Sequence, residues 1–110
     1  MAAIKKNECT IEEISEGRRR YLAHTSNLMT AVIDFNDGPS AEPDLPHSHP
    51  HEQTTYVAAG KVIFFLDGVG TMLEAGDLYT VPPNVPHTIQ LLTEHVRLVD
   101  NFTPLREEFL

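Results

Sequence analysis

The sequence predicts an all-β protein, built as an antiparallel sandwich or barrel. Short runs in which apolar and polar residues alternate recur along most of the chain. Glycine and proline residues interrupt these runs at short intervals, as turn residues do between neighbouring strands. Only the segment Thr10–Ser15 and the last few residues have a helical pattern, so the elements are expected to be strands almost throughout.

The N-terminal part of the chain, residues 10–20, gives mixed signals for secondary structure. Thr10–Ser15 opens with a Thr-x-x-Glu capping pattern, formed by Thr10 and Glu13, which predicts a helical turn. Ile11 and Ile14 favour a strand instead, so the pattern is mixed. The basic run Arg18–Arg20 is interpreted as a solvated strand edge or turn, because the acidic balance of the whole chain argues against a nucleic-acid site.

The clearest strand is predicted over Leu28–Phe35, where Met29, Ala31, Ile33 and Phe35 share one face at a period of two. A proline-rich connection, residues 36–46, follows it and is incompatible with a helix. Further strands are predicted at Thr54–Ala58, Lys61–Asp67, Thr71–Glu74, Asp77–Val81, Thr88–Leu92 and His95–Phe102.

The length of the chain limits the number of domains, and its net charge limits the expected partners. A chain of 110 residues has room for a single domain, expected over residues 1–110. The net charge of −8 would repel phosphate backbones, so neither nucleic acid nor an anionic membrane is an expected partner.

Location and assembly follow from weaker signals. There is no apolar run of about 18 residues, no signal-peptide pattern, and one cysteine, Cys9, which cannot form an internal disulfide. These features predict a cytoplasmic protein. A small barrel has open edges, so a homodimer involving the N-terminal strands is expected.

Histidines near the middle of the chain form the main candidate site. His47 and His49 share a face of an extended chain, and Gln53 continues that face. Neutral imidazole binds divalent transition metals, and an amide oxygen is a suitable neutral ligand. His51 has the same parity, which leaves open whether it replaces one of the others. His87 begins a predicted strand whose inward face carries Ile89 and Leu91, so it points into the barrel and completes a set of four.

The spacing of these residues resembles that of the two sequence motifs of the cupin superfamily. Its first motif, G-x5-H-x-H-x3,4-E-x6-G, is matched by His47, His49 and Gly60, with Gln53 at the glutamate position. Its second motif, G-x5-P-x4-H-x3-N, is matched by Gly76, Pro82 and His87. The resemblance implies a cupin-type double-stranded β-helix, a jelly-roll barrel, with its motif region at 47–87. It also implies one divalent transition metal ion, nickel, zinc, manganese or iron, held by His47, His49, Gln53 and His87.

Three positions depart from the cupin motifs. Ala41 and Leu91 stand where the motifs have glycine and asparagine, and both are interpreted as scaffold changes. Gln53 replaces a glutamate, which changes the chemistry of the site. Three imidazoles and an amide leave the +2 charge of a divalent ion uncompensated, which makes it a stronger Lewis acid and a better anion site.

The last predicted strand adds a carboxylate to the interior. Its inward face carries Val96, Leu98, Asp100 and Phe102. Burying Asp100 without a partner would cost several kcal/mol, so a functional role is expected unless the residue reaches solvent at the strand end. Arg106 follows, and its guanidinium suits a substrate carboxylate. A surface ion pair with Glu107 or Glu108 is the alternative for Arg106.

The ending DNFTPLREEFL and the segment PHSHPHEQTTYV are similar to the small cupins of the pectin-degradation protein KdgF type. That resemblance covers nearly the whole chain and includes the tail 100–110. It implies opening and ketonisation of 4,5-unsaturated monouronates from pectin or alginate to linear 4-deoxy-5-keto uronates. Asp100, Phe102 and Arg106 match the family's tail pattern. They are the implied catalytic residues, and Phe102 and Arg106 are also implied to bind the small anionic sugar-derived substrate.

Two alternatives stay open from the sequence. A cupin of this kind can bind a sugar acid through its metal without turning it over. Three histidines can also hold iron in a cupin dioxygenase, whose activity would depend on oxygen.

Overall fold

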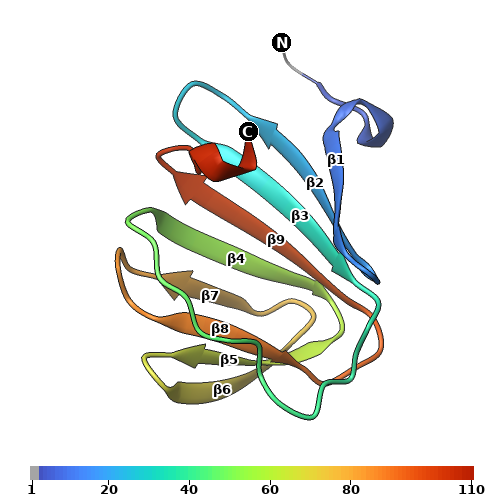
Figure 1. Ribbon diagram of the computed structural model, residues 1–110, viewed down its shortest axis with the longest axis vertical. Coiled ribbons are helices and arrows are strands. Elements are labelled where there is room, and N and C mark those ends of the chain that lie inside the picture. The colour runs from blue at the N-terminus through green and yellow to red at the C-terminus, as the bar shows by residue number, and fades with distance from the viewer. Residues whose placement is uncertain (1–2) are drawn as a thin grey trace.

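A computed structural model, which describes residues 3–110, consists of two antiparallel β-sheets that enclose a common core (Figure 1). The larger sheet has the strand order β1-β2-β3-β9-β4-β7, and the smaller has the order β6-β5-β8. The strands are β1 (Thr10–Ser15), β2 (Arg18–His24), β3 (Met29–Phe35), β4 (Glu52–Ala59), β5 (Lys61–Leu66), β6 (Val69–Glu74), β7 (Leu78–Val81), β8 (His87–Leu91) and β9 (Val96–Thr103). Two short 3-10 turns, η1 (Lys6–Glu8) and η2 (Glu107–Phe109), lie near the chain ends.

The predicted strands from residue 28 onward are confirmed, with ends that differ by one or two residues. The helical turn predicted over Thr10–Ser15 is wrong, because this segment is the edge strand β1 and pairs with β2. A capping pattern stabilises a helix only locally, whereas pairing with β2 satisfies the backbone of the whole segment. The helical turn predicted for the last residues is present as η2.

Strand β9 lies at the centre of the larger sheet, between β3 and β4. Along its length buried residues alternate with partly buried ones, and the predicted inward face is confirmed: Val96, Leu98, Asp100 and Phe102 are all buried. Apolar residues from both sheets surround the first part of this face, including Phe35, Val57 and Leu91. Asp100 therefore lies deep between the sheets.

The connection between β3 and β4 runs along β8 and closes the smaller sheet on that side. The backbone N–H of Ser40 donates to Leu91 and that of Asp44 donates to Ile89. Farther along, His47 and His87 exchange both backbone hydrogen bonds, at 3.1 and 2.9 Å. This pairing brings segments 40 residues apart in sequence to the same point.

The C-terminal segment covers the inner side of the larger sheet at one end. In Figure 1 the turn η2 lies across β3 and β9. Leu105 and Phe109 pack there against a buried cluster made by Leu22, Met29, Ala31 and Phe102. Within residues 3–110, no helix is long and apolar enough to cross a membrane.

Candidate metal centre and adjoining cavity

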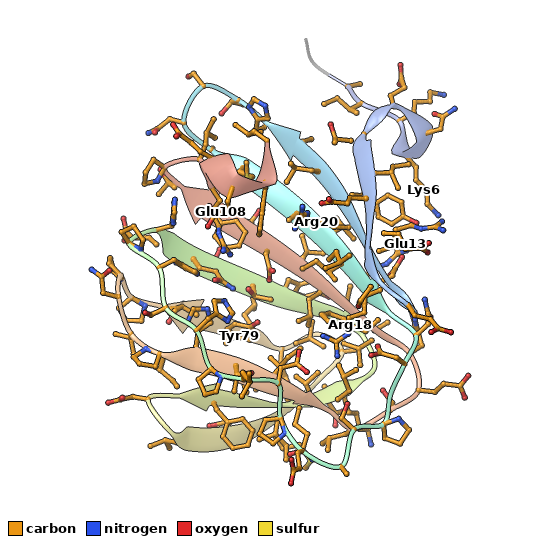
Figure 2. All side chains as sticks on the ribbon, in the orientation of Figure 1. Lys6, Glu13, Arg18, Arg20, Tyr79 and Glu108 are labelled. Atoms are coloured by element: carbon orange, nitrogen blue, oxygen red, sulfur yellow. The ribbon has the colours of Figure 1, made fainter. Side chains whose placement is uncertain are left out.

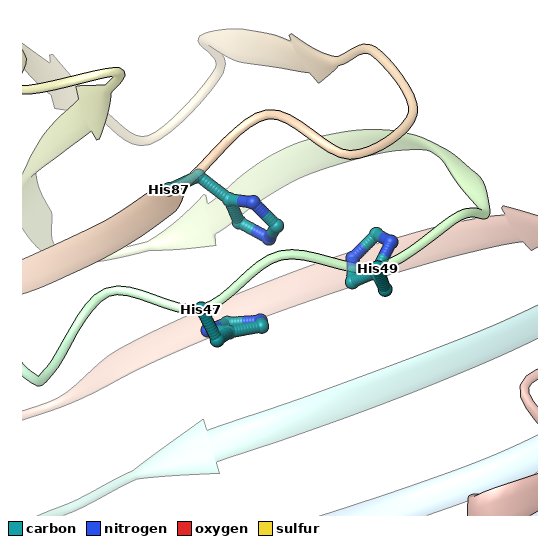
Figure 3. A group of neighbouring side chains, drawn as sticks. All are labelled: His47, His49 and His87. Atoms are coloured by element: carbon teal, nitrogen blue, oxygen red, sulfur yellow. The ribbon is translucent and has the colours of Figure 1, made fainter.

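Three histidine rings meet at the point where the β3–β4 connection pairs with β8 (Figure 3). His47 and His49 come from the connection, and His87 is the first residue of β8. One ring nitrogen from each histidine lies within 4.8 Å of those of the other two. The ring centroids of His47 and His87 are 4.3 Å apart, and those of His49 and His87 are 4.9 Å apart. Three nitrogen atoms this close together could hold a metal ion.

Hydrogen bonds fix the tautomers of two of these rings. Nδ1 of His49 lies 3.1 Å from the carbonyl oxygen of His51, and Nδ1 of His87 lies 3.0 Å from that of Val85. A carbonyl oxygen only accepts, so each Nδ1 carries the proton and donates it. Nε2 of each neutral ring is then free to bind a metal. Nε2 of His87 is buried and has no hydrogen-bond partner among the described residues.

The surroundings of the three rings favour their neutral form. Burial, together with the nearby His87, lowers the pKa of His47 to about 4. Burial also lowers the pKa of His49 and of His87, and the positive charge of Arg106 acts in the same direction on both. Neutral imidazole is the form that binds a metal ion, so the rings are ready to act as ligands at neutral pH.

Gln53, on β4, completes the set predicted from the sequence. Its Oε1 lies 3.0 Å from Nε2 of His49, and its amide nitrogen donates to the hydroxyl of Thr55 at 2.9 Å. Because Nδ1 of His49 carries that ring's proton, two atoms that only accept hydrogen bonds face each other here. A cation bound by both atoms would turn this repulsion into attraction. The donor set of three imidazoles and one amide therefore fits a divalent transition metal ion.

His51 does not join this group. Its Nε2 lies 3.1 Å from the carbonyl oxygen of Leu105, in the C-terminal segment. The sequence could not decide between His51 and its neighbours, because alternation gives all three the same parity. The structure turns the side chain of His51 toward the tail instead, where it links the tail to the loop that carries the histidines.

A cavity of about 290 Å³ adjoins the histidines. All three candidate catalytic residues line it, together with three of the four candidate ligands: His47, Gln53, His87, Asp100, Phe102 and Arg106. The fourth, His49, packs with the edge of its ring against Phe102, at 5.7 Å between centroids. Six of the seven residues singled out in the sequence thus line a single cavity, and the seventh, His49, packs against one of them.

Asp100 is buried and does not reach solvent at the strand end, so that alternative is wrong. Its Oδ1 accepts a hydrogen bond from the hydroxyl of Thr55 at 2.6 Å. Burial raises the pKa of Asp100 to about 6, because an ionised carboxylate loses hydration inside the protein. A carboxyl group with a pKa near neutrality can both take up and release a proton at physiological pH.

Arg106 combines both interpretations drawn from the sequence. Its guanidinium forms an ion pair with Glu108 at 3.2 Å, yet its side chain is only 13% exposed and lines the cavity. The guanidinium also stacks on the rings of Phe102 and Phe109, at 5.1 and 4.2 Å from their centroids. Its Nε is buried and has no acceptor among the described residues. An anionic ligand in the cavity would supply one.

The basic run contributes a further cavity residue that the sequence analysis did not predict. Arg20 is 8% exposed, forms an ion pair with Glu12, and lies 3.8 Å from the centroid of the Phe109 ring (Figure 2). The interpretation of the run as solvated is wrong for this residue. Arg20 has the same parity as the apolar Leu22, and that alternation was the signal for an inward-facing arginine.

The other two arginines of the run differ from Arg20. Arg18 also lines the cavity, but ion pairs with Asp37 at 3.0 Å and Asp44 at 2.7 Å occupy its guanidinium. Arg19 faces outward and pairs with Glu13. Among the described residues, Arg20 and Arg106 are therefore the arginines of the cavity wall that each pair with a single, exposed carboxylate.

Comparisons with known proteins agree with this geometry. Residues 32–101 match the family model described as "Cupin domain". The chain is 33% identical over 106 residues to the pectin degradation protein KdgF of Dickeya dadantii, and the match covers 94% of each protein. Among solved structures, it resembles an RmlC-like cupin from Shewanella frigidimarina, with 35% identity and a TM-score of 0.87 over 100% of this chain and 96% of the other. KdgF from Halomonas sp. superposes with a TM-score of 0.86 and 27% identity over 100% of both chains. The two-sheet architecture is that of a jelly-roll barrel, and the chain belongs to the cupin family.

Proposed function

We propose that this protein is a metal-dependent enzyme that opens the ring of 4,5-unsaturated monouronates derived from pectin or alginate. The products would be linear 4-deoxy-5-keto uronates. One observation carries the proposal: Asp100, Phe102 and Arg106 line the same cavity as the candidate metal ligands His47 and His87. The similarity to KdgF over 94% of the chain supports it. The active unit in this proposal is a single domain, residues 1–110.

The metal site of this proposal consists of His47, His49, His87 and the amide oxygen of Gln53. When bound, a divalent ion would supply a Lewis acid that stabilises negative charge on a substrate oxygen. Since all four ligands are neutral, they leave the charge of the ion uncompensated, which favours an anionic substrate. The ligand types do not select among nickel, zinc, manganese and iron.

Asp100 is proposed to move the proton that the reaction needs. As the ring opens, the C1 hydroxyl loses its proton, C1 becomes an aldehyde, and the bond from C1 to the ring oxygen breaks. That oxygen is left as an enolate at C5, and protonation of C4 converts the enolate to a ketone. Atoms are conserved, so one group that accepts a proton and later returns it is sufficient. A carboxyl group with a pKa of about 6 suits both steps.

The arginines Arg20 and Arg106 form a cationic wall of the cavity, which is proposed to hold the substrate carboxylate. The Nε of Arg106, buried and without a partner among the described residues, would donate to it. Arg20 would add a second positive charge close to it, since both guanidiniums lie against the ring of Phe109. Phe102 would form an apolar wall against the sugar ring.

The proposal extends to location and assembly. With 16 acidic residues against 8 basic ones, we expect neither nucleic acid nor a membrane as a partner. The cytoplasmic location expected from the sequence is part of the same proposal. A homodimer is proposed through the edge strand β1, where Ile11 and Ile14 are 45% and 44% exposed. Light scattering of the purified protein would measure its mass in solution.

The direct test follows the absorbance of the conjugated double bond of unsaturated galacturonate. The metal-loaded protein should speed its loss well beyond the spontaneous rate, in the presence and absence of oxygen. The Asp100→Ala variant should lose the acceleration and keep its metal content. Unchanged decay with metal present would favour a cupin that binds a sugar acid without turnover, and activity lost without oxygen would favour a dioxygenase.

A further inference from the structure

A buried hydrogen-bonded chain connects the candidate metal centre to Asp100. Oε1 of Gln53 faces Nε2 of His49 at 3.0 Å, and the Gln53 amide nitrogen lies 2.9 Å from the hydroxyl of Thr55. That hydroxyl lies 2.6 Å from Oδ1 of Asp100. Thr55 is fully buried on β4, directly opposite Asp100 in the pairing of β4 with β9.

The direction of each hydrogen bond follows from chemistry. An ionised Asp100 can only accept, so the single hydroxyl proton of Thr55 is donated to it. The oxygen of Thr55 must then accept from Gln53, and only the amide nitrogen of Gln53 can donate. The amide is therefore oriented with its oxygen toward His49 and the metal centre.

We propose that Thr55 is a positioning residue that orients the Gln53 amide, so that its oxygen faces the metal, and holds Asp100 in place. This inference rests on the proposed metal site and extends it by one residue. Thr55 touches neither metal nor substrate in this scheme. It acts through the two side chains on either side of it.

The same series of hydrogen bonds explains why position 53 carries a glutamine where the cupin motif has a glutamate. A carboxylate at position 53 has no hydrogen to donate to Thr55. The one hydroxyl of Thr55 would then have to serve two carboxylates, at 53 and at 100, each of which needs a donor when buried. An amide supplies a donor to Thr55 and an acceptor to the metal. Gln53 is thus matched to Asp100 through Thr55.

The test measures binding of Zn²⁺ alone, by competition with a chromophoric chelator. Thr55→Val keeps the shape of the side chain and removes the hydroxyl. It should weaken Zn²⁺ binding about tenfold or more, as the loss of a group that orients a metal ligand typically does. Thr55→Ser restores the hydroxyl and should bind within about threefold of wild type. The matched control is Thr54→Val, on the exposed face of the same strand, which should not differ from wild type.

A double-mutant cycle separates positioning from a general effect on folding. If Thr55 acts through Gln53, then Thr55→Val should cause no further loss of Zn²⁺ affinity in a Gln53→Ala background. Should Thr55→Val fail to fold, Thr55→Ala removes the same hydroxyl and takes its place. Wild-type Zn²⁺ affinity in a folded Thr55→Val protein, or fully additive losses in the cycle, would overturn the proposal. Neither readout uses the uronate, so failure of the proposed reaction would leave this test intact.

Discussion

At the scale of single residues, the candidate site combines neutral side chains that could bind a metal with a buried carboxyl group. His87 presents an unpaired, buried Nε2, and Gln53 presents an amide oxygen to the same region. Asp100 sits apart from them, separated by Thr55. In the proposed mechanism this separation leaves the carboxylate available for proton transfer, because Asp100 is not among the side chains grouped as candidate metal ligands.

Asp100 should make the stability of the metal-free protein depend on pH. Its folded-state pKa of about 6 lies above its ordinary value near 4, so the folded state holds the proton longer than the unfolded state does. The stability from this group is complete below pH 4 and is lost as the pH rises through 6. The free energy of unfolding of wild type relative to Asp100→Asn should fall by about 3 kcal/mol across that window.

Urea unfolding with chelator present, at several pH values, measures this difference. The three histidines with lowered pKa values act in the opposite direction, losing their contribution as the pH falls. Both proteins contain them, so they cancel in the comparison. If the free energies of unfolding of the two proteins changed with pH in parallel, the raised pKa of Asp100 would be contradicted.

Arg20 should contribute to substrate binding more than to turnover. Arg20→Gln removes a positive charge from the cavity wall while Arg106 remains. Steady-state kinetics on unsaturated galacturonate should show KM raised by about tenfold, equivalent to about 1.4 kcal/mol, with a much smaller change in kcat. Arg19→Gln, on the outer face of the same strand, is the matched control. An equal effect of both substitutions would show that only overall charge matters.

At the scale of elements, sequence patterns predicted the strands whose two sides differ. Strand β9 has one buried face and one partly buried face, and its alternation was readable, including the inward position of Asp100. Strand β1 could not be recognised in this way, because all six of its residues are exposed. In β2, the three consecutive charged residues led us to interpret the run as solvated, although Arg20 and Leu22 lie two residues apart and therefore share one face. The choice between His51 and the other histidines depended on a contact with Leu105, 54 residues away.

The C-terminal turn η2 should be required for the cationic wall. Phe109 packs beside Phe102 and carries both Arg20 and Arg106 against its ring. Phe109→Ala removes that support. It should lower the free energy of unfolding by about 1 to 3 kcal/mol and raise KM. Denaturant unfolding and kinetics measure the two effects. Leu110→Ala, at a position 63% exposed, should change neither quantity. If Phe109→Ala also changed neither, the turn would be dispensable for the cationic wall.

At the scale of the whole molecule, the fold brings distant segments to one centre. The histidines come from the β3–β4 connection and from β8, Gln53 from β4, and Asp100 from β9. Spacing in the sequence predicted which residues would meet, because the two motifs flank strands that pair. The distances, the tautomers and the hydrogen bonds of Thr55 could not be predicted, since they depend on how the two sheets pack.

Metal binding should therefore stabilise the entire fold. At a Zn²⁺ concentration about 100 times Kd, binding to the folded state alone adds about 2.7 kcal/mol. For a domain of this size Tm should rise by roughly 10 °C. Thermal unfolding followed by circular dichroism, with chelator or with Zn²⁺, measures the shift. His87→Ala should lose most of it, and an equal shift in that variant would indicate that Zn²⁺ binds elsewhere.

The location of the metal is the most direct test of the whole account. Anomalous diffraction at the absorption edge of the bound metal would find it in crystals of the loaded protein. We predict one peak, about 2.1 Å from a ring nitrogen of His47, His49 and His87 and from Oε1 of Gln53. A peak away from these four side chains, or a Gln53 amide turned with its nitrogen toward the metal, would contradict it.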